Sequence, residues 1–370
     1  MSKYVEIAKR ENNNKRGFLI VNPFLGKHIA KNPLKVISVF ADMATLQPKG
    51  MTPSKTLVIG FAETATALGL QYAICNRCLY MQTTREQVAG NHEYLYFAEE
   101  HSHATAQYIV KDAFERYLET IDRIIFVDDE ITTGKTVLNA IASIERAYPR
   151  VSLSYAVVSI LNSMNVEQRD TYDKKGIDVL YLSQIKNDGY EAKANSYRYD
   201  GKTQYVREDE VLETPISYQG QTHQLPDLRF GMYAPYYYTC VQDLWHDQYW
   251  KHMKPEIEGK NVLVLGVEET MYAGLALADM MYEHVNRVKF HATTRSPISV
   301  SKDSGYPVHK RYVLDSPYEK GRETYVYDLK AYDKVYIVAE ASYLRNPNGL
   351  SELIVQLRHA GNTDIKVIGV

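Results

Sequence analysis

Residues 124–136 read Ile124-Ile125-Phe126-Val127-Asp128-Asp129-Glu130-Ile131-Thr132-Thr133-Gly134-Lys135-Thr136, and this stretch decides the fold. Its first four residues are apolar and β-branched or aromatic, which is typical of a buried strand. After the stretch, apolar residues recur at helical spacing from Val137 to Ile144. The pattern predicts a strand, a pair of acids, a turn of small residues and a helix, in that order.

The turn from Thr132 to Thr136 combines backbone N–H groups, hydroxyls and the positive end of the following helix, which together suit a phosphate group. Asp128 and Asp129 precede the turn and would repel that phosphate. They are suited to accepting hydrogen bonds from sugar hydroxyls or to holding a divalent cation through water. Gly134-Lys135-Thr136 also looks like the end of a Walker A loop, but that loop needs a glycine at the position of Asp129. The sequence therefore argues against a P-loop ATPase.

Composition limits the classes of protein that remain. A length of 370 residues predicts two domains. The formal net charge of −2 argues against nucleic acid as a partner. Three cysteines favour a reducing cytoplasm, and Cys75 with Cys78 is either a reduced pair or half of a zinc site. With no signal-like start and no apolar run of ~18 residues, we expect a soluble protein with no membrane partner.

Strands alternate with helices along most of the chain, which predicts a mostly parallel sheet with crossover helices. Residues 1–16 are expected to form a loose arm or an edge element. The expected strands are 34–40, 56–60, 79–83, 124–127, 151–161, 262–265, 288–292, 335–338 and 365–370. The expected helices begin near Glu63 and span 104–120, 137–147, 272–284 and 350–359.

The two halves of the chain resemble each other, which indicates a duplication. Residues 57–64 align with 263–270, residues 83–85 with 293–295, and residues 122–127 with 333–338. The second copy has lost the acid pair, because Ala339 and Glu340 replace Asp128 and Asp129. Its turn, residues 343–347, is bulkier and includes Pro347, which lacks a backbone donor.

Residues 124–136 closely resemble the phosphoribosyl-pyrophosphate (PRPP) motif of type I phosphoribosyltransferases. The chain to about residue 200 is similar to the orotate-phosphoribosyltransferase-like family of bacterial tellurium-resistance and stress-response gene clusters, and residues 294–297 spell the TRSP tetrapeptide that names its second domain. The resemblance implies a type I phosphoribosyltransferase with a Rossmann-like, mostly parallel sheet, followed by a degenerate phosphoribosyltransferase-like α/β lobe. The expected domains are 17–200 for the transferase, 201–245 for a Tyr- and Pro-rich linker or hood, and 246–370 for the TRSP domain.

The resemblance also implies a reaction. Ribose 5-phosphate would move from PRPP to a nucleobase-like acceptor with the help of Mg²⁺, and pyrophosphate would be released. Asp128 and Asp129 would grip the ribose and serve the metal, directly, through water or through PRPP. Glu130 departs from the family, and its charge either steers Mg²⁺ or substrate or faces solvent. The 5′-phosphate would be held by Thr132, Thr133, Gly134, Lys135 and Thr136, and the pyrophosphate by Gly60, Phe61, Ala62, Glu63, Thr64 and Arg85.

Other residues remain open to two interpretations. His101 and His103 end a stretch that matches the flexible loop of this fold, and they serve proton transfer, cap a helix, or do both. In the second lobe Glu268, Glu269, Arg295 and Ser296 either bind a second ligand or form a docking scaffold. We expect a cytoplasmic homodimer that works beside other products of a stress-response gene cluster. The alternative function is a regulatory protein that binds PRPP or a nucleotide without turnover.

Overall fold

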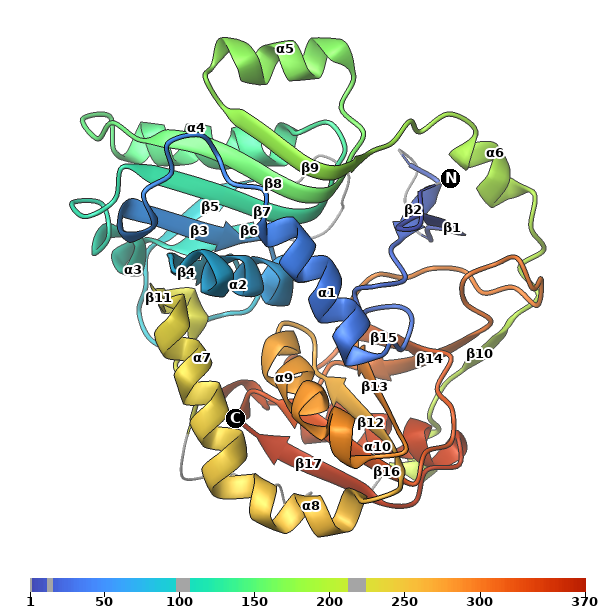
Figure 1. The fold of residues 1–370 in the computed structure, drawn as a ribbon. Coiled ribbons are helices and arrows are strands. Elements are labelled where there is room, and N and C mark those ends of the chain that lie inside the picture. Colours follow the sequence, from blue (N-terminus) through green and yellow to red (C-terminus); the bar gives the residue numbers. More distant parts are fainter. Residues whose placement is uncertain (1, 12–15, 98–106, 212–223) are drawn as a thin grey trace.

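The computed structural model describes residues 2–11, 16–97, 107–211 and 224–370. It has two α/β lobes, drawn in the upper and lower halves of Figure 1. Between them lie helices α1 (Pro33–Ala44), α2 (Ala65–Asn76) and α9 (Met271–Met281). Each lobe is built on its own sheet, mostly parallel in the first and entirely parallel in the second, which confirms the α/β class expected from the alternation of strands and helices.

The first lobe has a sheet in the order β11-β4-β3-β7-β8-β9, and all neighbours run parallel except β11. Gly60 at the end of β3 pairs with Val127 of β7 and with Gln82 of β4, so the segments that follow these three strands leave the same edge. The strands are β3 (Thr56–Gly60), β4 (Leu79–Gln82), β7 (Arg123–Ile131), β8 (Ser154–Asn162), β9 (Asp178–Gln184) and β11 (Met232–Tyr233).

The second lobe repeats this arrangement. Its sheet has the order β13-β12-β16-β17, entirely parallel, which corresponds strand by strand to β4-β3-β7-β8. The strands are β12 (Asn261–Gly266), β13 (Arg287–Ala292), β16 (Lys334–Ala339) and β17 (Ile365–Gly369). The blocks that align in the sequence therefore occupy equivalent places in the two lobes.

A hairpin follows the second strand of each copy, and it too is repeated. In the first lobe β5 (Tyr94–Phe97) and β6 (Gln107–Val110) pair antiparallel, and Thr84 bridges to Tyr108. In the second lobe β14 (Lys310–Asp315) and β15 (Glu323–Tyr327) pair antiparallel, and Thr294 bridges to Tyr325. The correspondence thus extends beyond the segments in which the sequences look alike.

The remaining elements connect or cover the lobes. β1 (Glu6–Lys9) pairs with β2 (Phe18–Val21), and β10 (Lys202–Gln204) joins β14 at the edge of the second hairpin. The helices are α1 (Pro33–Ala44), α2 (Ala65–Asn76), α3 (Lys111–Glu115), α4 (Lys135–Ala147), α5 (Val166–Lys174), α6 (Tyr190–Asn195), α7 (Ala234–Asp243), α8 (Lys251–Ile257), α9 (Met271–Met281) and α10 (Pro347–His359), with a π-helical stretch (Leu244–Trp250) between α7 and α8. Among the described residues, no helix combines the length and apolar character needed to span a bilayer.

Two expected elements are wrong. Residues 34–40 belong to helix α1 rather than to a strand, because Asn32 caps the helix by accepting the N–H of Lys35, and Pro33 occupies the first turn. The helix expected over 104–120 is replaced, in its described part, by strand β6 and the short helix α3. There the antiparallel partner β5 determines the conformation of residues 107–110.

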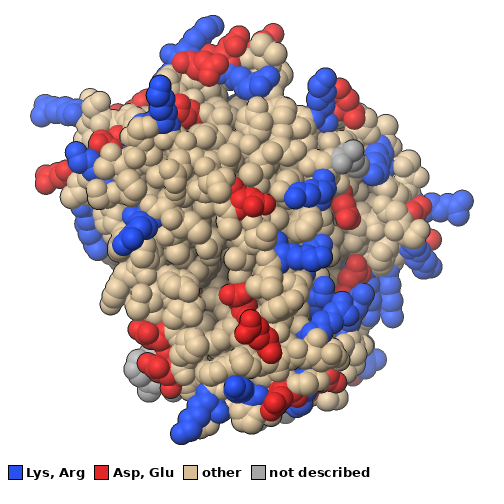
Figure 2. Space-filling view, viewed as in Figure 1, with Lys and Arg blue, Asp and Glu red and all other residues tan. Residues whose placement is uncertain are grey.

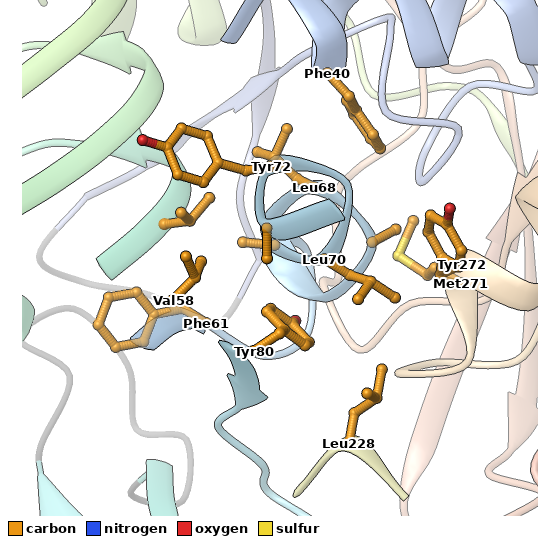
Figure 3. Close-up of a cluster of buried hydrophobic side chains, with 14 of the residues drawn as sticks. Phe40, Val58, Phe61, Leu68, Leu70, Tyr72, Tyr80, Leu228, Met271 and Tyr272 are labelled. Atoms are coloured by element: carbon orange, nitrogen blue, oxygen red, sulfur yellow. The ribbon is translucent and has the colours of Figure 1, made fainter. Parts of the chain in front are cut away.

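Helix α2 is central to the core because it packs between the two lobes. Figure 3 shows it end-on, with Phe61 and Val58 of the first lobe on one side and Met271 and Tyr272 of α9 on another. Leu70 is fully buried on the side of α2 that faces α9. The stability of the pair of lobes therefore depends on apolar packing around this helix.

We predict that Leu70→Ala lowers the free energy of unfolding by about 2–5 kcal/mol, because it leaves a cavity where the lobes meet. Leu34→Ala is the matched control, since Leu34 is 41% exposed on α1, and its effect should stay within about 0.5 kcal/mol. Urea unfolding monitored by circular dichroism measures both. Equal losses for the two variants would contradict the central place given to α2.

Candidate functional site

The acid pair lies at the end of β7, where both Asp128 and Asp129 are partly exposed. The backbone N–H of Asp129 donates to the carboxylate of Asp128 at 2.9 Å. Glu130 does not face solvent: its side chain is 11% exposed and pairs with Arg16 at 2.9 Å. Burial raises the pKa of Glu130, and Arg16 opposes this increase. The extra acid of this motif is therefore held by the N-terminal segment.

The turn after the acids is shaped by Gly134, which has a φ of +76° and caps α4. Its carbonyl oxygen accepts the hydroxyl of Tyr172 at 2.6 Å, and Tyr172 is itself buried on α5. A Cβ at position 134 would lie 2.5 Å from that hydroxyl, so only glycine fits. Thr132, Thr133 and Thr136 are partly exposed around this turn and Lys135 is exposed, so their polar groups can reach a ligand.

The loop after β3 begins at Gly60, where a Cβ would lie 2.6 Å from the carbonyl oxygen of Ala65. Phe61 is buried and stacks on Phe126 with ring centroids 5.6 Å apart, and the N–H of Ala62 donates to Thr83. The Ala62–Glu63 peptide bond is cis. The N–H groups of Glu63 and Thr64 make no hydrogen bond to any described residue and lie at the start of α2, where anions bind favourably.

The side chain of Glu63 points to the second lobe, away from the edge of the first sheet where its loop lies. Its carboxylate accepts the hydroxyl of Thr294 at 2.7 Å and the N–H of Arg295 at 3.2 Å. It also pairs with Lys27 at 3.2 Å. Burial opposes its ionisation, but Lys27, Arg295 and these hydrogen bonds outweigh that effect and lower the pKa of Glu63 to about 2.

Glu269 makes the mirror-image contact from the second lobe. It accepts the hydroxyl of Thr84 at 2.9 Å and the N–H of Arg85 at 3.1 Å. Glu63 and Glu269 occupy equivalent positions in the two copies, as do the Thr-Arg pairs that they bind. The lobes are thus joined by a reciprocal pair of contacts with approximate two-fold symmetry, and Arg85 is positioned by the second lobe.

Further charged side chains, buried or partly buried, surround the pair formed by Glu63 and Glu269. Arg295 donates to Glu268 at 2.8 Å and contacts Glu86, and Arg322 donates to Glu268 at 2.7 Å and to Glu86 at 2.9 Å. Burial raises the pKa of Glu268 to about 8, and Arg322 offsets this only in part. Burial also lowers the pKa of Arg295 to about 9. The side chains of Glu268, Glu269 and Arg295 therefore form hydrogen bonds and ion pairs within the protein. The N–H of Ser296 donates to the hydroxyl of Thr294.

In the second lobe, protein groups fill the place that corresponds to the acid pair and the turn. Arg229 is fully buried and donates to Glu340, which stands where the first lobe has Asp129, at 2.8 Å. It also donates to Glu269 at 2.8 Å and to Thr84 at 3.0 Å. Asn346 in the corresponding turn donates to Asp315 and to the carbonyl oxygen of Ser316.

The structure thus brings together the acid pair, the turn at 132–136, the loop at 60–64 and Arg85 on one edge of the first sheet. His101 and His103 lie outside the described residues. Among the residues described, no cluster of three His, Cys, Asp or Glu side chains could hold a metal ion. Sequence reasoning missed Lys27, Arg229 and Tyr172, whose partners lie 36 or more positions away (27 to 63, 172 to 134, 229 to 269).

We predict that Glu63→Gln lowers the free energy of unfolding at pH 7 by about 3 kcal/mol, because it leaves the buried Lys27 without its carboxylate partner and removes one of the carboxylates around Arg295. The folded-state pKa of Glu63, about 2, lies below the ordinary value of 4.5. Its contribution is therefore present above pH 4.5 and lost as the pH falls towards 2.

Urea unfolding of wild type and variant between pH 7 and pH 3 measures this contribution, and the variant should show the weaker pH dependence. Glu93→Gln is the control, since Glu93 is 74% exposed in its salt bridge to Lys111 and should change stability by no more than about 0.5 kcal/mol. A pH dependence identical to wild type would show that Glu63 is not ionised in the lobe contact.

Comparison with known proteins places this geometry in a family. Residues 4–186 match the family model described as phosphoribosyl transferase, and residues 229–357 match the model described as the TRSP domain C-terminal to it. A search of curated proteins found no match.

Solved structures that match part of this chain include adenine phosphoribosyltransferases and an orotate phosphoribosyltransferase. The Trypanosoma brucei adenine enzyme is 14% identical over 49% of this chain and 76% of its own, with a TM-score of 0.36. The Giardia lamblia adenine enzyme is 16% identical over 49% and 93%, with a TM-score of 0.36. The Aeropyrum pernix orotate enzyme is 10% identical over 50% and 86%, with a TM-score of 0.29.

The two family models lie in the order expected from the PRPP-like motif and the TRSP tetrapeptide. The first covers β3, β4, β7, β8 and β9 of the first sheet, and the second covers β12, β13 and β16 of the second sheet. The chain belongs to the phosphoribosyl transferases that carry a TRSP domain C-terminal to the transferase domain.

Proposed function

We propose that this protein transfers ribose 5-phosphate from PRPP to a nitrogenous, base-like acceptor in the presence of Mg²⁺, releasing pyrophosphate. The observation that supports this proposal is the edge formed by β4, β3 and β7. One segment there offers two carboxylates and a phosphate-type turn. The neighbouring segment offers the N–H groups of Glu63 and Thr64, which make no hydrogen bond to a described residue.

Each part of PRPP has a complementary group on this edge. The carboxylates of Asp128 and Asp129 accept hydrogen bonds from the ribose 2′- and 3′-hydroxyls. The N–H groups and hydroxyls of residues 132–136, at the start of α4, hold the 5′-phosphate. The loop at 60–64 and Arg85 receive the pyrophosphate, and a guanidinium can contact two phosphate oxygens at once.

Mg²⁺ fits this set of residues as a metal shared with the ligand. Mg²⁺ is typically bound by one or two carboxylates together with waters and phosphate oxygens, rather than by a cage of protein ligands. Asp128 and Asp129 supply such carboxylates at the end of β7. When bound, the ion would neutralise negative charge on the pyrophosphate as it leaves.

The reaction breaks the bond between C1 of the ribose and the pyrophosphate oxygen, which keeps the electron pair. A lone pair of the acceptor nitrogen forms the new bond to C1, and a proton leaves the acceptor. As this bond breaks, positive charge develops at C1 and negative charge on the departing pyrophosphate. Fixed donors around the pyrophosphate stabilise that negative charge and so favour the transition state. We propose His101 or His103 as the group that takes the proton.

The proposed site predicts how PRPP binds. Wild type should bind PRPP with Mg²⁺ at one site per chain in isothermal titration calorimetry, because only the first lobe keeps the acids and the turn. Asp128→Asn/Asp129→Asn should bind at least tenfold more weakly, since hydrogen bonds to charged groups contribute about 1.5–3 kcal/mol each.

Asp42→Asn/Asp247→Asn is the matched control, because it removes two exposed carboxylates from α1 and from the π-helical stretch, and it should bind like wild type. Two sites per chain would show that the second lobe still binds PRPP. Unchanged affinity of the Asp128/Asp129 variant would refute the proposal that these carboxylates bind the ribose hydroxyls of PRPP.

The proposed reaction also predicts turnover of PRPP. With a suitable acceptor the protein should release pyrophosphate, and the Asp128→Asn/Asp129→Asn variant should not. A coupled pyrophosphate assay over a panel of purine, pyrimidine and other nitrogen-containing acceptors measures this. Tight PRPP binding without release across the panel would favour the regulatory alternative, in which PRPP is bound and reported but not consumed.

A further inference from the structure

A second candidate site is a pocket of about 400 Å³ on the second lobe. It is lined by the first half of β13, the start of β14, the loop between β15 and β16, and the segment that precedes α1. None of its lining residues belongs to the acid pair, the two phosphate-type segments or the reciprocal contact. A volume of this size lies within the range of small-molecule sites.

The pocket is rich in positive charge. Arg287, Lys289, Lys310 and Lys330 line it. Among the described residues none of the four forms an ion pair with a carboxylate, and Lys310 Nζ lies 4.3 Å from the ring centroid of Tyr312. The lining includes one carboxylate, Asp328, whose oxygens accept the N–H groups of His309 at 3.0 Å and Lys310 at 2.7 Å. Figure 2 shows Lys and Arg side chains gathered over the region of β13 and β14.

These cations repel one another. Burial lowers the pKa of Lys289, and Arg287, Lys31, Lys35 and Lys330 lower it further. Burial also lowers the pKa of Lys310, with a smaller effect from Lys202. Such a cluster is unfavourable without a counter-charge, and a bound anion would relieve the repulsion.

The pocket also has a less polar wall. Leu329 is buried and Ile29 and Tyr332 are partly buried, and all three line the pocket. His309 lines it as well, and its Nδ1 lies 2.8 Å from the carbonyl oxygen of Ser301. Because a carbonyl can only accept, Nδ1 carries a proton, and Nε2 is the ring atom left to meet a ligand.

We propose that this pocket binds a small ligand with two adjacent phosphates and a planar ring, that is, a nucleoside diphosphate. Four cations match the negative charge of a diphosphate. The wall of Tyr332, Leu329 and Ile29 suits a ring, and Nε2 of His309 suits a hydroxyl group of the nucleoside, which can either donate or accept. A concave pocket in a chain of net charge −2 favours a small molecule over a nucleic acid strand, which needs an extended basic stripe.

ADP in EDTA, titrated calorimetrically into the full-length protein, tests this proposal without reference to turnover. We expect one ADP per chain. Binding should weaken at least tenfold in Lys289→Gln/Lys330→Gln and stay unchanged in Lys174→Gln/Lys175→Gln, which removes the same charge from the exposed end of α5. It should also persist in Asp128→Asn/Asp129→Asn, which separates this site from the proposed PRPP site.

Pyrophosphate and adenosine test the two halves of the ligand. Pyrophosphate should bind more weakly than ADP, and adenosine more weakly still, because the phosphates meet the cations. Thermal unfolding should show that the Lys289→Gln/Lys330→Gln variant remains folded and is not stabilised by ADP. Absence of ADP binding, equal weakening in both lysine variants, or loss only in the Asp128/Asp129 variant would overturn the proposal.

Discussion

The reciprocal contact of Glu63 and Glu269 is the interaction on which the arrangement of the two lobes depends. Each carboxylate accepts a hydroxyl and a backbone N–H from the Thr-Arg turn of the opposite lobe. Hydrogen bonds to a charged acceptor are stronger than neutral ones, and in a buried setting their geometry is restrictive. Because Glu63 belongs to the loop proposed for pyrophosphate and Arg85 follows Thr84, the contact that joins the lobes also fixes two parts of the proposed site.

The acids that follow the equivalent strands β7 and β16 have different surroundings in the two lobes. The first lobe leaves its acid pair partly exposed at the sheet edge, whereas in the second lobe Glu340 is neutralised by Arg229. A buried ion pair gives little net stability relative to apolar packing, but removing one partner is costly. The charges therefore define one way of docking the lobes, while the apolar residues around α2 supply most of the stabilisation.

Much of the fold was predictable from residue patterns, because parallel strands and crossover helices have distinct periodicities and the PRPP-like motif joins both. Short apolar runs were the weak point. Residues 34–40 suit either a strand or a helix by periodicity alone, and the signals that distinguish them, Asn32 and Pro33, precede the run. Contacts such as those of Arg229 to Glu269 and Glu340 were beyond prediction, because they form only when two lobes distant in sequence dock.

Joining two equivalent lobes in one polypeptide has a consequence for how the protein can change. In a symmetric dimer of identical chains, every substitution at the interface appears twice, once on each side of the axis. Here a substitution at Glu63 leaves Glu269 intact, so each half of the contact can vary alone. The tether also keeps the halves at a fixed effective concentration, so dilution does not separate them. One lobe could thereby bind its Glu340 with Arg229 while the other kept both acids of the pair.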